Sequence, residues 1–124
     1  MIYALDGNDI MILLDGNDTA DGGPGEDWID YYYSANPVFV NMANNRTDIP
    51  ALNEFDLFYN VEDIVGSTHN DNITGDANNN KFIPHRGSDN VDGNGGDHDW
   101  ILYNEVRFNF VINQSSIRII AYLN

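Results

Sequence analysis

Apolar residues recur every nine positions near the start of this chain. Three units of nine residues follow one another without a gap between residues 4 and 30, with Met11, Ala20 and Ile29 at the eighth place. The fourth place of each unit is glycine and the sixth is aspartate. A glycine-rich half followed by three residues that bury one apolar side chain predicts a turn and a short strand in each unit.

The period returns in an eroded form after residue 65. The eighth place then holds, in order, Ile73, Phe82, Val91 and either Trp100 or, with a one-residue slip, Ile101. The apolar character of this place survives better than the glycines and aspartates do. We therefore expect a second, degenerate block that extends the same core.

No repeat is visible between the two blocks, in residues 31–65. The run PVFVNM alternates apolar and polar side chains like a half-buried strand, and NNRTDIPALNE is typical of a loop. The run DLFYNVEDIV places Leu57, Val61 and Ile64 at helical spacing. We expect a strand, a loop and a helix of one or two turns.

The C-terminal segment has a different pattern of apolar and polar residues. VRFNFVI and IRIIAYL each alternate apolar and polar positions, and NQSS separates them. This pattern predicts a β-hairpin. We expect it to cap the open end of the coil, as solenoids require for solubility.

Together these elements predict an all-β fold in one domain. Stacked units form a right-handed coil with two edges made of turns, and the eighth-place side chains fill its narrow core. The expected parts are a first repeat block (1–30), a spacer (31–65), a second block (66–101) and the hairpin cap (102–124).

Composition narrows the possible partners. The 124 residues contain 20 Asp or Glu against 5 Lys or Arg, a net charge of −15, which repels nucleic acids and anionic membranes. The hydrophobic fraction of 42% favours a folded chain over a disordered acidic tail. With no cysteine there are no disulfides or thiolate metal sites, and MIYALDGNDIMILL is neither a cleavable signal nor a membrane span.

The aspartates at the sixth place of successive units need a counterion. In stacked turns its carboxylates lie at strand spacing, about 4.8 Å, where two of them repel by roughly 3 kcal/mol at an effective dielectric constant of 20. Calcium meets this need, because it accepts six to eight oxygens from carboxylates and backbone carbonyls. Magnesium is the weaker candidate, since it demands a tight octahedron and keeps its water.

With this period and these columns the chain resembles the RTX family of haemolysin-type calcium-binding nonapeptides, G-G-x-G-x-D-x-U-x, in which U is a large apolar residue. GGPGEDWID (22–30) matches at every specified place. The resemblance implies a right-handed parallel β-roll with calcium between stacked units n and n+2. Its ligands would be the sixth-place aspartates and carbonyls of the glycine turns.

Carried over to this sequence, the resemblance implies the following ligand groups. Asp9 with Gly7 and Asp27 with Gly23 and Gly25 share one site. Asp18, with Gly16, faces the other edge. Asp71 and Asp89, with Gly87, share a second site, and in the last unit either His98 or, after a deletion, Asp99 holds the sixth place.

The chain also departs from the family pattern. Leu5 and the pair Leu13 and Leu14 stand where the family has glycines, so strained or remodelled turns are expected there. Asn78 and Asn80 replace glycine and aspartate in their unit, which leaves a weak site at best.

An EF-hand loop is the closest rival motif. The residues at its places 1, 3, 5 and 12 are Asp15, Asn17, Thr19 and Glu26. Ala20 stands where that loop needs glycine, and no helical pattern flanks it, so we favour the repeat.

Several other side chains have both a structural and a functional interpretation. For His69, His85 and His98 we expect exposed turn positions, because no metal-binding spacing surrounds them. Trp28, Trp100 and the YYY run at 31–33 are candidates for a sugar-binding surface, but we favour packing. The sequence contains no nucleophile elbow and no P-loop, so we expect no enzyme activity.

The resemblance implies a non-catalytic calcium-binding module of a secreted, extracellular bacterial protein. Such modules leave the cell by type I secretion and fold outside on binding calcium. One alternative is an appendage that binds or orients the substrate of a secreted protease, lipase or polysaccharide epimerase, and another is an adhesin module. Beyond calcium, a polysaccharide or a host surface is then a partner of the parent protein, whereas nucleic acid and membrane insertion are not expected.

Overall fold

The computed structural model describes residues 1–103, 109–112 and 117–121, and the side chains of residues 1–102. These residues form β-strands and one short 3-10 helix, η1 (Met42–Asn44), so the expected all-β fold class is confirmed. No helix in the described part of the chain is long and apolar enough to cross a membrane.

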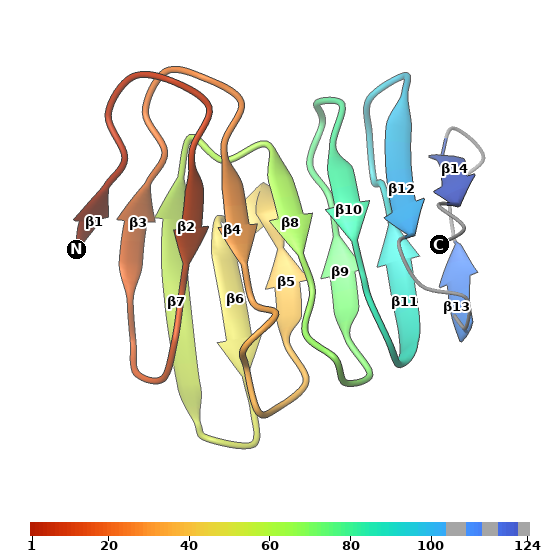
Figure 1. Cartoon of the computed structure of the whole chain (residues 1–124), viewed down its shortest axis with the longest axis horizontal. Helices are drawn as coiled ribbons and strands as arrows, with labels where there is room; N and C mark the ends of the chain where they lie inside the picture. The colour runs from red at the N-terminus through yellow and green to blue at the C-terminus, as the bar shows by residue number, and fades with distance from the viewer. Residues whose placement is uncertain (104–108, 113–116, 122–124) are drawn as a thin grey trace.

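The strands form two sheets, which Figure 1 shows as two layers. In spatial order, the eight-stranded sheet contains β1 (Ile2–Tyr3), β3 (Thr19–Asp21), β7 (Glu54–Tyr59), β6 (Arg46–Ile49), β5 (Phe39–Asn41), β9 (Asn72–Thr74), β11 (Ser88–Asp92) and β13 (Asn109–Ile112). The six-stranded sheet contains β14 (Ile117–Ala121), β12 (Asp99–Tyr103), β10 (Lys81–Ile83), β8 (Asp63–Val65), β4 (Trp28–Asp30) and β2 (Ile10–Ile12).

The chain visits the two sheets alternately through the repeat blocks, and the N-terminus lies at one end of the long axis (Figure 1). Paired strands within one block are parallel and 18 residues apart, so that Met11 lies opposite Ile29 and Ile73 opposite Val91. Two units of nine residues therefore make one circuit. Between β10 and β12 the offset is 19 residues and Phe82 lies opposite Ile101, which confirms the one-residue slip.

The eighth-place residues form the core. Strands β3, β4 and β10, of three residues each, bury their middle side chain and leave the two outer ones more exposed, because successive side chains of a strand point to opposite faces. The eighth-place side chains, all at most 5% exposed, are Met11, Ala20, Ile29, Ile73, Phe82, Val91 and Ile101.

The spacer differs from the prediction in two respects. The strand expected at PVFVNM is confirmed as β5, with Val38, Val40 and Met42 buried. The expected loop contains β6, which pairs antiparallel with β5 and β7. The expected helix is wrong, because its residues form the end of β7 and all of β8. Pairing of these segments with β3 and β4 outweighs their helical spacing.

Two repeat units are concealed in the second half of the spacer. Phe58 lies opposite Ala20 and Ile64 opposite Ile29, so both occupy the eighth place. Their sixth places are Asp56 and Glu62. The row of buried eighth-place side chains therefore continues into the spacer through Phe58 and Ile64.

The predicted C-terminal hairpin is also wrong. β13 pairs parallel with β11, whereas β14 pairs parallel with β12 in the other sheet. Each strand extends the sheet that the alternating path reaches next, where an unpaired strand edge is available. The segments 104–108, 113–116 and 122–124 of the predicted hairpin lie outside the described residues.

Candidate metal centre

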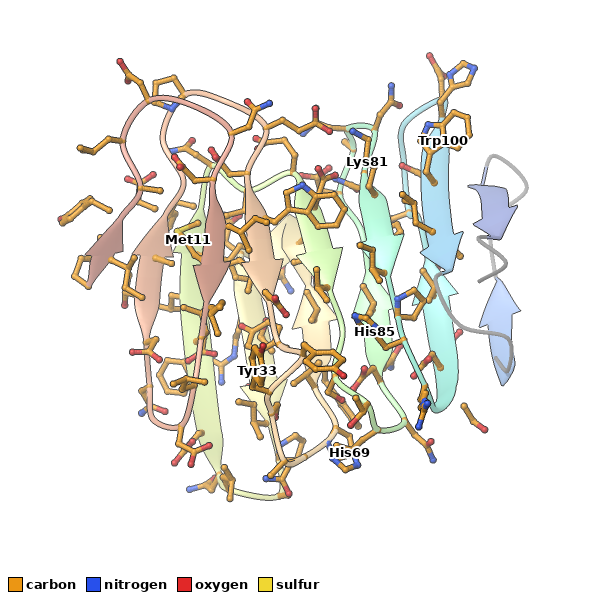
Figure 2. The ribbon with its side chains drawn as sticks, in the orientation of Figure 1. Met11, Tyr33, His69, Lys81, His85 and Trp100 are labelled. Carbon is orange, nitrogen blue, oxygen red and sulfur yellow. The ribbon has the colours of Figure 1, made fainter. Side chains whose placement is uncertain are left out.

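The sixth-place residues line two edges, at the turns that precede the strands. The first edge precedes the six-stranded sheet and carries, in spatial order, Asp9, Asp27, Glu62, Asn80 and Asp99. Lys81 and Trp100, each one residue further on, mark this edge in Figure 2, and His69 lies at the opposite edge. Each edge thus places polar side chains from successive turns beside one another.

Asp9 and Asp27 are brought together at the first edge, as predicted. The backbone N–H of Asp9 donates to Asp27 Oδ1 at 2.8 Å, and the N–H of Trp28 donates to the Asp9 carbonyl at 2.8 Å. Asp27 is fully buried, and the Oδ2 atoms of both aspartates are buried without a hydrogen-bond partner among the described residues. Buried carboxylate oxygens without partners are costly, so this pair favours a cation.

Two glycines allow the turns around this pair to approach closely. A Cβ atom on Gly25 would lie 1.7 Å from the carbonyl oxygen of Gly7, and one on Gly23 would lie 2.3 Å from that of Leu5. Only glycine permits such contacts. Leu5 itself has a φ of +71°, which confirms the strain expected for a bulky residue at that place.

The donor set fits calcium. No group of three or more acidic or histidine side chains suited to a metal occurs among the described residues, so a site at Asp9 and Asp27 needs backbone oxygens as well. The carbonyls of Leu5 and Gly7 lie against the glycines of the next turn. Calcium accepts mixed carboxylate and carbonyl ligands, whereas zinc prefers nitrogen and sulfur.

Beyond Asp27 the first edge is held together by protein groups. Glu62 Oε2 accepts the N–H of Asp27 at 2.9 Å, and burial raises the pKa of the Glu62 carboxyl. Asn80 donates from Nδ2 to the Glu62 carbonyl at 2.7 Å and accepts the N–H of Asp76 at 3.0 Å. Both ends of its amide are therefore used, and the prediction of at most a weak site at Asn80 is consistent with this geometry.

Asp99 occupies the sixth place of the last unit. Its Oδ1 accepts the N–H of Asn80 at 2.9 Å, and the residue is fully buried. His98, the alternative for this place, is exposed. Asp99 lies 19 residues after Asn80, so the last unit gains one residue instead of losing one, and the expected deletion is wrong although Asp99 holds the sixth place.

At the second edge, Asp18 meets a residue that the sequence reading did not single out. The N–H of Asp18 donates to Asp56 Oδ1 at 2.8 Å, while the hydroxyl of Tyr31 donates to Asp56 Oδ2 at 3.0 Å. Glu54 Oε2 accepts the N–H of Gly16 at 2.8 Å. Burial raises the pKa values of Asp56 and Tyr31. Both oxygens of Asp56 thus have protein donors, which makes this pair less suited to a cation than Asp9 and Asp27.

Asp71 and Asp89 are also brought together, since the N–H of Asp71 donates to Asp89 Oδ1 at 2.9 Å. Asp71 already accepts hydrogen bonds from the N–H of Val38 and from both the N–H and the hydroxyl of Ser67. Burial raises the pKa of Asp71 to about 6 and that of Asp89 to about 7. A Cβ on Gly87 would lie 2.3 Å from the His69 carbonyl, so these turns are also in close contact.

A hollow of about 310 Å³ lies beside the first edge, on the outer face of the six-stranded sheet. Lys81 forms an ion pair there with Glu26, and its backbone N–H donates to the buried Asp63. Burial raises the pKa of Asp63 to about 7. The residues that line the hollow are Glu26, Glu62, Asn79, Asn80, Lys81, His98 and Trp100.

Two other expectations are corrected here. His85 is only 8% exposed and contacts the ring of Tyr32 edge-on, with 4.7 Å between the ring centroids, so it is not an exposed turn residue. An EF-hand around Asp15 is excluded, because β2 and β4 flank this region where that motif has helices.

The sequence reading missed Asp56, Glu62 and Tyr31. A signal for the first two exists, because Asp56 precedes Phe58 and Glu62 precedes Ile64 by the same two places as in the repeats. Asn60, two residues before Glu62, has a φ of +51° and replaces the fourth-place glycine. No local pattern marks Tyr31, whose role depends on a contact across the core.

The chain matches no known protein-family model. No curated protein is significantly similar to it.

Proposed function

We propose that this protein is a non-catalytic calcium-binding module built as a right-handed parallel β-roll. The roll is supported by two sheets visited alternately and by parallel pairing 18 residues apart. Calcium binds between the turns that carry Asp9 and Asp27, with the carbonyls of Leu5 and Gly7 as further ligands.

One observation carries this proposal: Asp27 is fully buried and its Oδ2 atom has no hydrogen-bond partner, and the Oδ2 atom of Asp9, whose backbone N–H donates to Asp27 Oδ1, has none either. The net charge of −15 disfavours unneutralised carboxylates at the edges. Calcium supplies two positive charges and tolerates irregular coordination. Bound there, it relieves the cost of burying both groups.

The proposal extends to folding and location. A ligand at 100 times its dissociation constant stabilises a one-site fold by about 2.7 kcal/mol. Extracellular calcium modules have dissociation constants of about 0.1 to 1 mM. In this proposal the chain is part of a secreted bacterial protein of the RTX type and completes its folding outside the cell, after type I secretion.

A calcium titration followed by far-ultraviolet circular dichroism tests the proposal. Protein freed of metal with chelator should keep a less stable fold, and it should gain β signal and thermal stability as calcium approaches millimolar concentration. Magnesium at equal concentration should have little effect. In Asp27→Asn the calcium response should weaken at least about tenfold, because the buried ligand loses its charge while keeping its shape.

Asp18→Asn is the matched control, since it makes the same change at the edge where Asp56 is satisfied by Tyr31. Its calcium response should stay close to that of the unaltered protein. A protein whose structure and melting temperature are indifferent to calcium would contradict the proposal.

A further inference from the structure

A second set of side chains joins successive turns, one place before the sixth. In each case the side-chain oxygen of an asparagine accepts a backbone N–H from the next turn on the same edge. The asparagines and the donors are Asn8 with Glu26 (3.0 Å), Asn17 with Phe55 (2.9 Å), Asn70 with Ser88 (2.8 Å) and Asn79 with Asp97 (2.9 Å) and His98 (3.0 Å).

Each asparagine is followed by a residue that bonds in the opposite direction. The backbone N–H of that residue donates to the sixth-place side chain of the later turn. The donors and acceptors are Asp9 with Asp27 (2.8 Å), Asp18 with Asp56 (2.8 Å), Asp71 with Asp89 (2.9 Å) and Asn80 with Asp99 (2.9 Å). This reciprocal pair of bonds occurs four times within residues 1–102, so it belongs to the repeat and not to one turn.

At the candidate calcium site the asparagine bond holds one short stretch of backbone. Glu26, whose N–H bonds to Asn8, lies between Gly25 and Asp27. Gly25 packs on the Gly7 carbonyl, and Asp27 carries the unpartnered oxygen. Asn8 therefore restrains the backbone that connects both parts of the site. Its own side chain is exposed, so a substitution there removes no core packing.

We propose that Asn8 is a positioning residue for calcium at Asp9 and Asp27, acting through the backbone of Glu26. It holds the turn of Asp27, before calcium binds, in the conformation that the bound ion requires. Less conformational entropy is then lost on binding. The inference rests on the proposed function. It assigns a task to the fifth place of the repeat, which the nonapeptide pattern leaves unspecified.

The test compares calcium affinity in Asn8→Ala, Asn8→Asp and Asn17→Ala by isothermal titration calorimetry on the whole chain. Terbium luminescence excited through tryptophan, in a Trp100→Phe background, reports binding next to Trp28, which directly follows Asp27. Displacement of terbium by calcium then gives the affinity at this site.

Asn8→Ala should weaken calcium binding by about tenfold, as loss of a supporting partner does at other metal sites. Asn8→Asp keeps the acceptor oxygen and should restore the affinity. Asn17→Ala loses the equivalent bond at the other edge and should leave the affinity at Asp27 unchanged, which separates positioning from a general loss of stability. Melting temperatures in chelator measure that general loss directly.

Unaltered affinity in Asn8→Ala would overturn this inference alone. Equal losses in Asn8→Ala and Asn17→Ala would overturn it as well, because they would indicate a common effect on stacking. If the unaltered protein binds neither calcium nor terbium, the proposed function and this inference fall together.

Discussion

Two glycines at the fourth place of their units have different surroundings. A Cβ on Gly25 would lie 1.7 Å from a backbone carbonyl of the neighbouring turn, whereas one on Gly16 would meet nothing within 4 Å. Gly16 has a φ of +112°, so alanine there suffers only backbone strain, about 1 to 2 kcal/mol. Gly25→Ala should therefore lower the melting temperature more than Gly16→Ala does.

Thermal unfolding in chelator, followed by circular dichroism, measures both variants without the contribution of calcium. Gly25→Ala should also abolish the calcium response, because separating the two turns removes the Gly7 carbonyl from the site. Equal melting temperatures would mean that the turns do not pack as closely as this carbonyl contact requires.

At the scale of elements, the position of a strand in its sheet decides its stability. β2 lies at the end of the six-stranded sheet and, among the strands that the structure describes, pairs with β4 alone, whereas β4 pairs with both β2 and β8. Ile10 and Ile12 on β2 are exposed by 66% and 47%, while Trp28 and Asp30 on β4 are partly covered. Exposed edges with few contacts open at low free-energy cost.

Hydrogen exchange checks this difference. Amides of β4 should exchange more slowly than those of β2 in the metal-free protein, because opening β4 breaks pairs on both sides. Added calcium should slow exchange in both strands, since the site between Asp9 and Asp27 precedes them. Faster exchange in β4 than in β2 would contradict the sheet order.

At the scale of the whole molecule, buried acids make stability depend on pH. Burial raises the pKa values of Asp63 and Asp89 to about 7 and that of Asp71 to about 6, against about 3.9 in an unfolded chain. The folded state therefore binds protons more tightly than the unfolded state between pH 4 and 7. For these groups the free energy of unfolding falls as pH rises through this window and levels off above about pH 7.

Metal-free protein should thus melt at a higher temperature at pH 5 than at pH 8. Asp63→Asn should reduce the difference, because the amide oxygen can still accept the N–H of Lys81 while the titrating group is gone. Melting curves at a series of pH values in chelator give both results. A melting temperature that rises from pH 5 to pH 8 would contradict the raised pKa values.

The sequence alone determined the nine-residue period, the all-β class and the core column, including Met11, Ile29 and Phe82. The resemblance to the nonapeptide family added that Asp9 and Asp27 are neighbours, which the hydrogen bond between them confirms. These features are local, since a turn and a strand in nine residues bury the same place in every unit. A strict period then brings together residues two units apart.

Only the tertiary structure decided how the irregular segments join this pattern. Leu57, Val61 and Ile64 suit a helix by spacing, yet Leu57 and Ile64 lie in strands because β3 and β4 offer edges to pair with, and Val61 lies in the connection between them. β13 and β14 likewise extend separate sheets. Pairings between distant segments depend on which edges and buried groups remain unsatisfied when the chain packs, and short-range periodicity does not contain that information.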